Sequence, residues 1–201
     1  MELGFFSRFF FLLLLIFTVF IHVLSIGSIP PGLSNDEVEY ALSGKTYALN
    51  GADLSGARFP ASLFVTQTSG SISAVPPILI SPLWRFLPLN QSTARLPYLI
   101  LNLLTAVGLG YLVFVLFNNQ AVSVLSSIIF LLNPWSLFLS RFAVEGAYAL
   151  LFFMTGIALL MRFQGWKLII PFFFLVMGFF SYHGAKIIFL PVIIICLIYR
   201  L

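Results

Sequence analysis

The stretch "FFFLLLLIFTVFIHVLSI", Phe9–Ile26, is followed almost directly by "PPGLSNDEVEY", Pro30–Tyr40. The first stretch is uncharged and is about as long as a helix that crosses a bilayer. The second carries three carboxylates close together, at Asp36, Glu37 and Glu39. We therefore expect a membrane helix that ends at an acidic rim. These acids either form a solvated loop or perform chemistry at the bilayer surface.

The composition of the whole chain favours a membrane protein. Of the 201 residues, 61% are hydrophobic and 8% are charged, whereas about 25% of residues are charged in ordinary soluble domains. A soluble fold of this length has too little interior to bury so much apolar surface. No basic run interleaved with aromatic residues indicates nucleic-acid binding. The single cysteine, Cys196, excludes an intramolecular disulfide.

The apolar windows predict an all-α fold: a polytopic transmembrane helical bundle of about six spans, forming one domain over residues 1–201. We interpret the first span as an uncleaved helix rather than a signal peptide, because further spans follow it. The chain stops at the end of a hydrophobic segment, so we expect it to be the N-terminal part of a longer protein. The predicted spans are 5–27, 96–117, 121–140, 143–162, 167–182 and 185–201.

One long polar segment, residues 28–95, separates the first predicted span from the second. Within it, "EVEYALSGKTYAL" (Glu37–Leu49) is suited to a short helix that lies along the membrane interface. The apolar stretch "VPPILISPLWRFLPL" (Val75–Leu89) is interrupted by four prolines. Proline removes a backbone donor and breaks helices, so we expect this stretch to be re-entrant or interfacial rather than spanning.

Basic residues in the short connections predict the orientation. If the six spans alternate, Arg8, Arg162, Lys167 and Arg200 fall on one side, which the positive-inside rule makes cytoplasmic. The segment 28–95 then faces outward. We therefore predict an integral protein of the cell (plasma) membrane whose acidic rim is extracytoplasmic.

Asp36 and Glu37 are the first candidate site residues, because a carboxylate at the mouth of a membrane cavity can accept a proton from an incoming hydroxyl or amine. One acid would act as the base while the other positions the acceptor or a cation. The alternative is structural. Ser34 or Asn35 would cap a short helix whose first turn contains both acids, where the helix dipole favours them.

Arg141 and Glu145 are the second candidate pair, within "NPWSLFLSRFAVEGAY". They are four residues apart and would share a face on one helix, although Pro134 makes a continuous helix uncertain. A guanidinium near the outer surface can hold a phosphate by a bidentate contact. The alternative is an ion pair that only neutralises the two charges.

Tyr182, His183 and Lys186 form the third candidate group, at the turn in "FFSYHGAKIIFLP". Lysine is suited to a phosphate, and histidine to an acid, base or ligand role. The alternative is a snorkelling lysine beside an aromatic belt. We predict no metal-ligand set. Carboxylates suit a hard divalent cation, which keeps one open as a cofactor, but two adjacent acids do not define a site.

The order of these features resembles the GT-C superfamily of membrane glycosyltransferases. One apolar helix precedes an outward Asp-Glu pair, followed by the Pro-Pro element "VPPILISPLW", the Arg-Leu-Pro helix start "ARLPYLIL", and then the segments that contain Arg141 and Lys186. The resemblance extends from about Pro30 to Pro191. It is closest to protein O-mannosyltransferases and lipid A aminoarabinose transferases. Each motif is short, and their order carries the resemblance.

The resemblance implies transfer of a hexose or pentose from a polyprenyl-phosphate-linked donor to a protein, lipid or glycan acceptor on the extracytoplasmic side of the bilayer. It implies that Asp36 is the catalytic base and Glu37 its neighbour. Arg141 and Glu145 would line the cavity, and Lys186 would contact the phosphate. We also expect Arg95, Tyr182 and His183 to bind substrate.

Two features depart from the family pattern. Val75 stands where the family usually has a histidine before the Pro-Pro element, and the chain ends after six predicted spans where these enzymes generally have more. Two other interpretations therefore stay open: a non-catalytic or truncated membrane subunit, and a transporter or flippase component. A transporter would place polar residues near mid-membrane. Here the ionisable residues gather near span ends, which favours surface chemistry.

Overall fold

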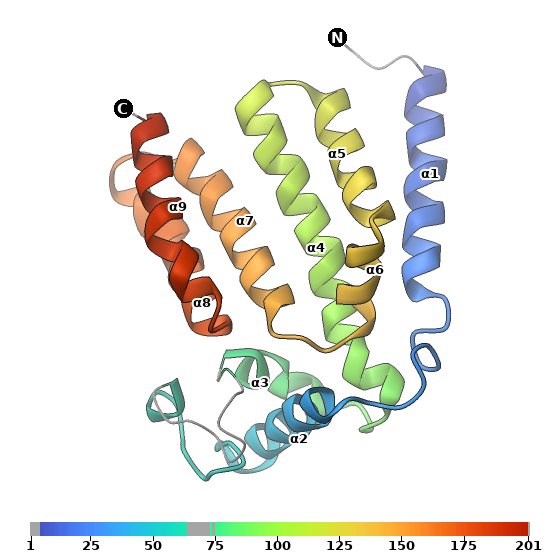
Figure 1. The fold of residues 1–201 in the computed structure, drawn as a ribbon, viewed down its shortest axis with the longest axis vertical. Coiled ribbons are helices and arrows are strands. Elements are labelled where there is room, and N and C mark those ends of the chain that lie inside the picture. The colour runs from blue at the N-terminus through green and yellow to red at the C-terminus, as the bar shows by residue number, and fades with distance from the viewer. Residues whose placement is uncertain (1–4, 64–72, 74, 201) are drawn as a thin grey trace.

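The computed structural model describes residues 5–63, 73 and 75–200, and the regular elements among them are all helical (Figure 1). This part of the chain confirms the all-α prediction. In chain order the α-helices are α1 (Phe5–Val23), α2 (Asn35–Asn50), α3 (Val75–Ile80), α4 (Gln91–Phe117), α5 (Gln120–Leu132), α6 (Pro134–Arg141), α7 (Gly146–Arg162), α8 (Ile169–Ser181) and α9 (Ala185–Arg200). Three short 3₁₀ helices accompany them: η1 (Ala61–Leu63), η2 (Ser81–Arg85) and η3 (Gly165–Leu168).

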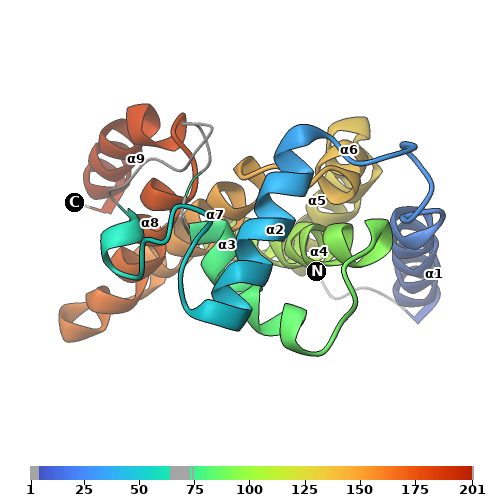
Figure 2. The same cartoon turned by 90° about the horizontal axis from the view of Figure 1, so that it is seen from below.

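The long helices stand side by side and alternate in direction (Figure 1). The start of α1, the α4–α5 turn, the α7–α8 connection and the end of α9 meet at one end of the bundle. The other end, at the bottom of Figure 1, is called the lower end here. It holds α2, α3 and the connections after α6 and α8, and Figure 2 shows α2 lying across it. The predicted alternation of the apolar segments therefore matches the arrangement of the helices.

The structure contains fewer bilayer-length helices among its described residues than the six spans that the sequence predicts. Among the described residues only α4, with 27 residues, is long and apolar enough to cross a membrane as one helix. At about 1.5 Å per residue it spans about 40 Å, more than the hydrocarbon core. The α5–α6 pair qualifies only if its 65° bend is counted within one span. The other apolar helices are shorter.

The bend between α5 and α6 has a local cause in "NPW". Asn133 ends α5, and its side-chain Oδ1 accepts a hydrogen bond from Trp135 N–H at 2.8 Å. Pro134 occupies the first turn of α6, where its missing N–H costs nothing. This cap and proline start a new helix, so the predicted span 121–140 becomes two helices.

The polar segment forms α2 as a helix with a cap at each end. Ser34 Oγ accepts Glu37 N–H at 3.3 Å while Glu37 Oε2 accepts Ser34 N–H at 2.8 Å, a reciprocal capping box. Gly51 ends the helix in the left-handed conformation, with φ 68°. The predicted helix at Glu37–Leu49 is therefore present. Its position at a membrane interface stays a prediction.

The core at the lower end joins α2, α3 and η2 to α4 and α7. Trp84 and Tyr98 are almost fully buried in it. Gly44 is required here, because a Cβ at that position would lie 2.7 Å from Trp84 Nε1. Prolines keep α3 and η2 short, as the sequence predicts. The same core contains Ala41 and Ala48 of α2 and Ala147 and Tyr148 of the first turn of α7.

Candidate functional site

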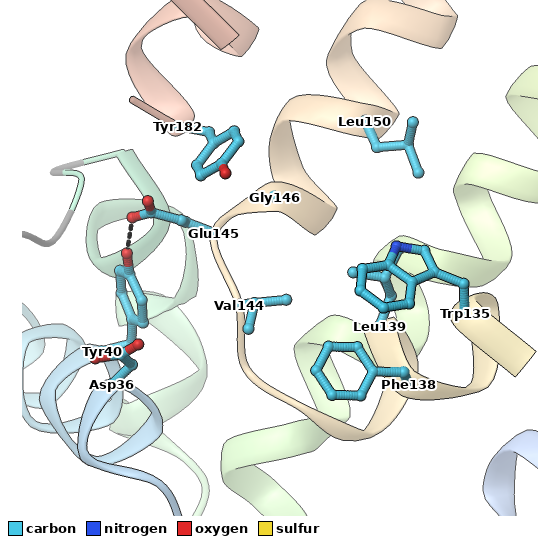
Figure 3. A pocket seen from close by; sticks show the side chains of 10 residues that line it. All are labelled: Asp36, Tyr40, Trp135, Phe138, Leu139, Val144, Glu145, Gly146, Leu150 and Tyr182. Atoms are coloured by element: carbon cyan, nitrogen blue, oxygen red, sulfur yellow. Dashed lines mark hydrogen bonds between the residues drawn. The ribbon is translucent and has the colours of Figure 1, made fainter. Parts of the chain in front are cut away.

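A pocket of about 520 Å³ opens at the lower end, between α2, α6, the start of α7 and the turn after α8 (Figure 3). Its volume lies in the range of small-molecule sites. Two carboxylates and two tyrosines contribute to one side, and aromatic and aliphatic side chains to the other (Figure 3). The lining residues are Asp36, Tyr40, Trp135, Phe138, Leu139, Val144, Glu145, Gly146, Leu150 and Tyr182.

Asp36 reaches the pocket because of its place in the first turn of α2. The cap at Ser34 fixes where the helix begins, and residues four apart lie on one face, so Asp36 and Tyr40 line the pocket together. Asp36 is exposed. An exposed carboxylate at the mouth of a pocket is free to accept a proton from a bound hydroxyl.

Glu145 is held by two donors from distant parts of the chain. Tyr40 donates its phenolic hydrogen to Glu145 Oε2 (Figure 3), and Ser73 N–H donates to the same oxygen at 3.2 Å. Burial raises the pKa of Tyr40 far above its usual value, and the neighbouring Glu145 charge raises it further. Tyr40 therefore stays protonated and remains a donor. Glu145 also precedes α7, where the helix dipole favours a negative charge.

Glu37 and Arg95 require a correction, because neither lines the pocket. Glu37 Oε1 lies 3.0 Å from Arg95 Nε, and the two side chains are 1% and 0% exposed. Glu37 also accepts Ala143 N–H at 3.3 Å and caps α2 through Ser34. Within the part of the chain that the structure describes, the partners of the Glu37 carboxylate are two backbone N–H groups and Arg95. We assign both residues to a buried ion pair rather than to catalysis or substrate binding.

Arg95 connects three segments through its remaining N–H groups. Nη1 donates to the carbonyl oxygens of Ile26 and Pro30 at 3.1 and 2.9 Å, and Nη2 donates to that of Gly32 at 2.6 Å. The guanidinium thus ties the chain that leaves α1 to α4 and to the start of α2. We call Glu37 with Arg95 the buried clasp.

Arg141 and Glu145 do not share a helix face, and no ion pair joins them within the described residues; of the two, Glu145 lines the pocket as expected and Arg141 does not. α6 ends at Arg141 and α7 begins after Glu145, with an extended connection between them. Arg141 Nη2 donates to the carbonyl oxygens of Ile21 and Leu24, both at 3.0 Å, at the end of α1. It therefore caps a helix and lines no part of the pocket.

The members of the third predicted group, Tyr182, His183 and Lys186, do not all lie at the pocket. Tyr182 lines the pocket, whereas His183 and Lys186 do not. Both are exposed, with Lys186 Nζ 3.4 Å from His183 Nδ1 and 5.8 Å from the centroid of the Phe179 ring. The contact with an aromatic ring favours the snorkelling alternative for Lys186. The expected meeting of Asp36 with Arg141 and Lys186 in one hollow is therefore not found.

Sequence reasoning missed Tyr40, Trp135 and Phe138. Tyr40 had a signal, because it lies one helical turn after Asp36. Trp135 follows Pro134, which starts a new helix. A large aromatic residue in the first turn of a helix lies near the end of that helix, where it can be exposed. Phe138 follows one turn later. No basic side chain is among the ten lining residues, so the pocket is acidic and aromatic rather than built to hold a phosphate.

Within the described residues, no three or more His, Cys, Asp or Glu side chains lie close enough together to hold a metal ion. Comparison of the chain with family models, curated proteins and solved structures finds no match. Interpretation of the pocket therefore rests on its own residues and on the order of the sequence motifs.

Proposed function

We propose that the protein is an integral-membrane glycosyltransferase of the GT-C type, which moves a sugar from a polyprenyl-phosphate donor to an acceptor at the lower end of the bundle. In this proposal α1, α4, α5 with α6, α7, α8 and α9 are the six passes, and the segment 28–95 with α2 and α3 is extracytoplasmic. The observation that carries it is the pocket in which Asp36, Tyr40 and Glu145 converge at the end of an apolar helical bundle.

The surface of α1 supports a lipid environment. Its buried side chains include the polar Thr18 and His22, at 1% and 0% exposure. A helix on a water-soluble protein has the opposite distribution, with apolar residues inside and polar residues outside. Among the α1 residues whose burial the structure describes (9 and 11–23), the exposed side chains are all apolar: Phe9, Leu12, Leu13, Leu15, Ile16, Phe17, Phe20 and Val23.

In the proposed reaction Asp36 is the general base. A hydroxyl of the acceptor gives its proton to the Asp36 carboxylate as its oxygen forms a bond to the anomeric carbon of the donor sugar. The bond from that carbon to the phosphate oxygen breaks, and the electron pair leaves with the polyprenyl phosphate. Asp36 then releases the proton to water. Glu145, fixed by Tyr40 and Ser73, orients the hydroxyls of the bound sugar.

The leaving phosphate is proposed to lie outside the pocket. Asp36 and Glu145 would repel an anion at close range. Lys186 and His183 are exposed on the turn that follows Tyr182, where they can meet an anionic headgroup at the rim. This assigns the acceptor to the acidic pocket and the lipid phosphate to its edge.

Transfer is tested with the full chain in proteoliposomes. We expect radiolabelled sugar to move from a polyprenyl-phosphate donor into a mixture of acceptor peptides, lipids and glycans, and we expect no transfer in liposomes that lack the protein. A chain that binds the donor but transfers nothing to any acceptor would contradict the proposal.

A non-catalytic membrane subunit is the second candidate. The observation that favours it is the absence of a basic side chain among the residues that line the pocket, because a transferase has to stabilise a leaving phosphate. The same transfer experiment separates the two candidates, since a subunit would bind a ligand without turnover.

The orientation has its own test. In a Cys196→Ser background, we expect Arg58→Cys in the outer segment to react with a membrane-impermeant maleimide on intact cells. Gln164→Cys, in the α7–α8 connection, should react only after permeabilisation. Arg58 and Gln164 are both exposed in the fold, so burial does not explain a difference. The reverse pattern would invert the proposed topology.

A further inference from the structure

The geometry of α6 points to Trp135 as a stacking platform for the ring of a sugar in the pocket. The inference rests on the proposed function only for the class of ligand. A sugar can bind to Trp135 without being transferred, so this inference and the proposed function are tested separately. None of the sequence motifs assigned a role to Trp135.

Three aromatic rings on successive turns form a continuous stack, and two of them, Trp135 and Phe138, line the pocket. Trp135 lies against Phe138 with 5.1 Å between ring centroids and 21° between planes, and Phe138 lies against Phe142 at 4.3 Å and 27°. Phe138 covers one side of the indole, yet Trp135 is still 66% exposed and lines the pocket. A flat aromatic surface is thus offered to whatever occupies the pocket.

The platform is held rigidly, which lowers the entropy cost of binding. Asn133 Oδ1 accepts Trp135 N–H at 2.8 Å and Pro134 restricts the backbone before it. Two contacts then fix α5 and α6 against α1. His22 Nε2 donates to the carbonyl oxygen of Leu131 at 2.8 Å, and Arg141 donates in return to the end of α1.

The two sides of the pocket match the two kinds of surface on a sugar ring. Carbon-bound hydrogens give a pyranose an apolar face, and the electron-rich face of an aromatic ring attracts such weakly positive hydrogens. The rim of the sugar carries hydroxyls that donate to oxygen. Asp36, Glu145 and Tyr182 stand across the pocket from Trp135 and Phe138 (Figure 3), and the carboxylates accept such bonds.

An exposed tryptophan also occurs as an anchor in the interfacial region of a bilayer, and the chain contains a residue of that kind for comparison. Trp166 is 80% exposed in η3, at the opposite end of the bundle, and it does not line the pocket. Trp135 differs because its ring stacks on Phe138, its backbone N–H is bound by Asn133, and it lines a pocket that also contains two carboxylates. Trp166 is therefore the matched control.

The test uses the full chain in nanodiscs and a panel of methyl glycosides of hexoses and pentoses, with binding measured by saturation-transfer NMR. We expect at least one glycoside to bind the wild type, and Trp135→Leu to bind it about tenfold more weakly. Trp135→Phe should retain most of the affinity, and Trp166→Leu should be unchanged. Equal affinity of Trp135→Leu and wild type, or no binding of any glycoside to the wild type, would overturn the inference.

A second measurement avoids any change at Trp135. In Trp166→Phe, acrylamide quenching of fluorescence reports on Trp135, because the remaining Trp84 is 1% exposed. A bound glycoside should reduce the quenching, and unchanged quenching at saturation would contradict the platform. Glycoside binding that depends on Trp135 without any transfer would reject the proposed function alone. Transfer with Trp135-independent binding would reject this inference alone.

Discussion

Replacing Arg95 by alanine is expected to lower the free energy of unfolding by about 3–5 kcal/mol, which is the cost of leaving one member of a buried ion pair without its partner. Glu37 would stay 1% exposed with no cation beside it. The Ile26 carbonyl would also lose its bond from Arg95, and the carbonyls of Pro30 and Gly32 would keep only the bonds from Gln91 Nε2. The effect is large because one guanidinium satisfies four groups at the junction of three segments.

Unfolding of the detergent-solubilised chain, followed by far-UV circular dichroism, measures this loss. Arg85→Ala is the matched control. Arg85 is exposed and, among the described residues, donates one hydrogen bond, to the Ala48 carbonyl at 3.3 Å, so its loss should cost about 1 kcal/mol. Equal destabilisation by the two alanine variants would show that the buried clasp contributes nothing special.

Glu37→Gln tests the other side of the clasp. It keeps the shape of the side chain but removes the charge that Arg95 faces, so we expect destabilisation in the same direction. The double variant Glu37→Gln with Arg95→Gln should cost less than the sum of the two single changes, because contacting residues are not independent. Additive costs would mean that the two side chains do not stabilise one another.

The apolar helices were predictable because apolar windows are a strong, local signal. The segments 96–117 and 143–162 correspond to α4 and α7, with ends displaced by a few residues. The division of 121–140 was harder, because it depends on a side-chain cap at Asn133 in addition to Pro134. The length of each helix is set by such local stops rather than by hydrophobicity alone.

The roles of neighbouring acids were not predictable from their composition. Asp36 and Glu37 are adjacent, and adjacent residues on a helix point about 100° apart. One therefore faces the pocket and the other faces Arg95. Only the cap residue, Ser34, could have been used to fix the helical phase. The partners of Glu37 and Arg141 lie 58 and about 120 positions away, a separation at which single-sequence patterns carry no information.

The buried clasp explains why the acidic pair Asp36 and Glu37 is compatible with both alternatives, a structural role for one acid and a catalytic role for the other. Ser34 caps α2 as the structural alternative requires. The Glu37 carboxylate accepts hydrogen bonds from Ser34 N–H and from Arg95. Asp36 is left exposed at the pocket. Fixing Glu37 in the core thus sets the rotation of α2 that places Asp36 and Tyr40 in the lining of the pocket. Loss of the clasp is expected to impair the pocket as well as stability.

Asp36→Asn is accordingly expected to reduce sugar transfer by a factor of about 10²–10⁴, the contribution typical of a general base. Asparagine has nearly the same shape but cannot take the proton, so donor binding and the unfolding midpoint should stay close to wild type. Initial rates of transfer in proteoliposomes at saturating donor measure the effect. Glu39→Gln is the control, because Glu39 is on the same helix but does not line the pocket.

Transfer by Asp36→Asn at the wild-type rate would remove Asp36 from the base role. Glu145, whose Oε2 accepts hydrogen bonds from Tyr40 and Ser73, would then be the next carboxylate of the pocket to test as the base. A catalytic pocket with neither acid as base would require the acceptor to be activated before it arrives.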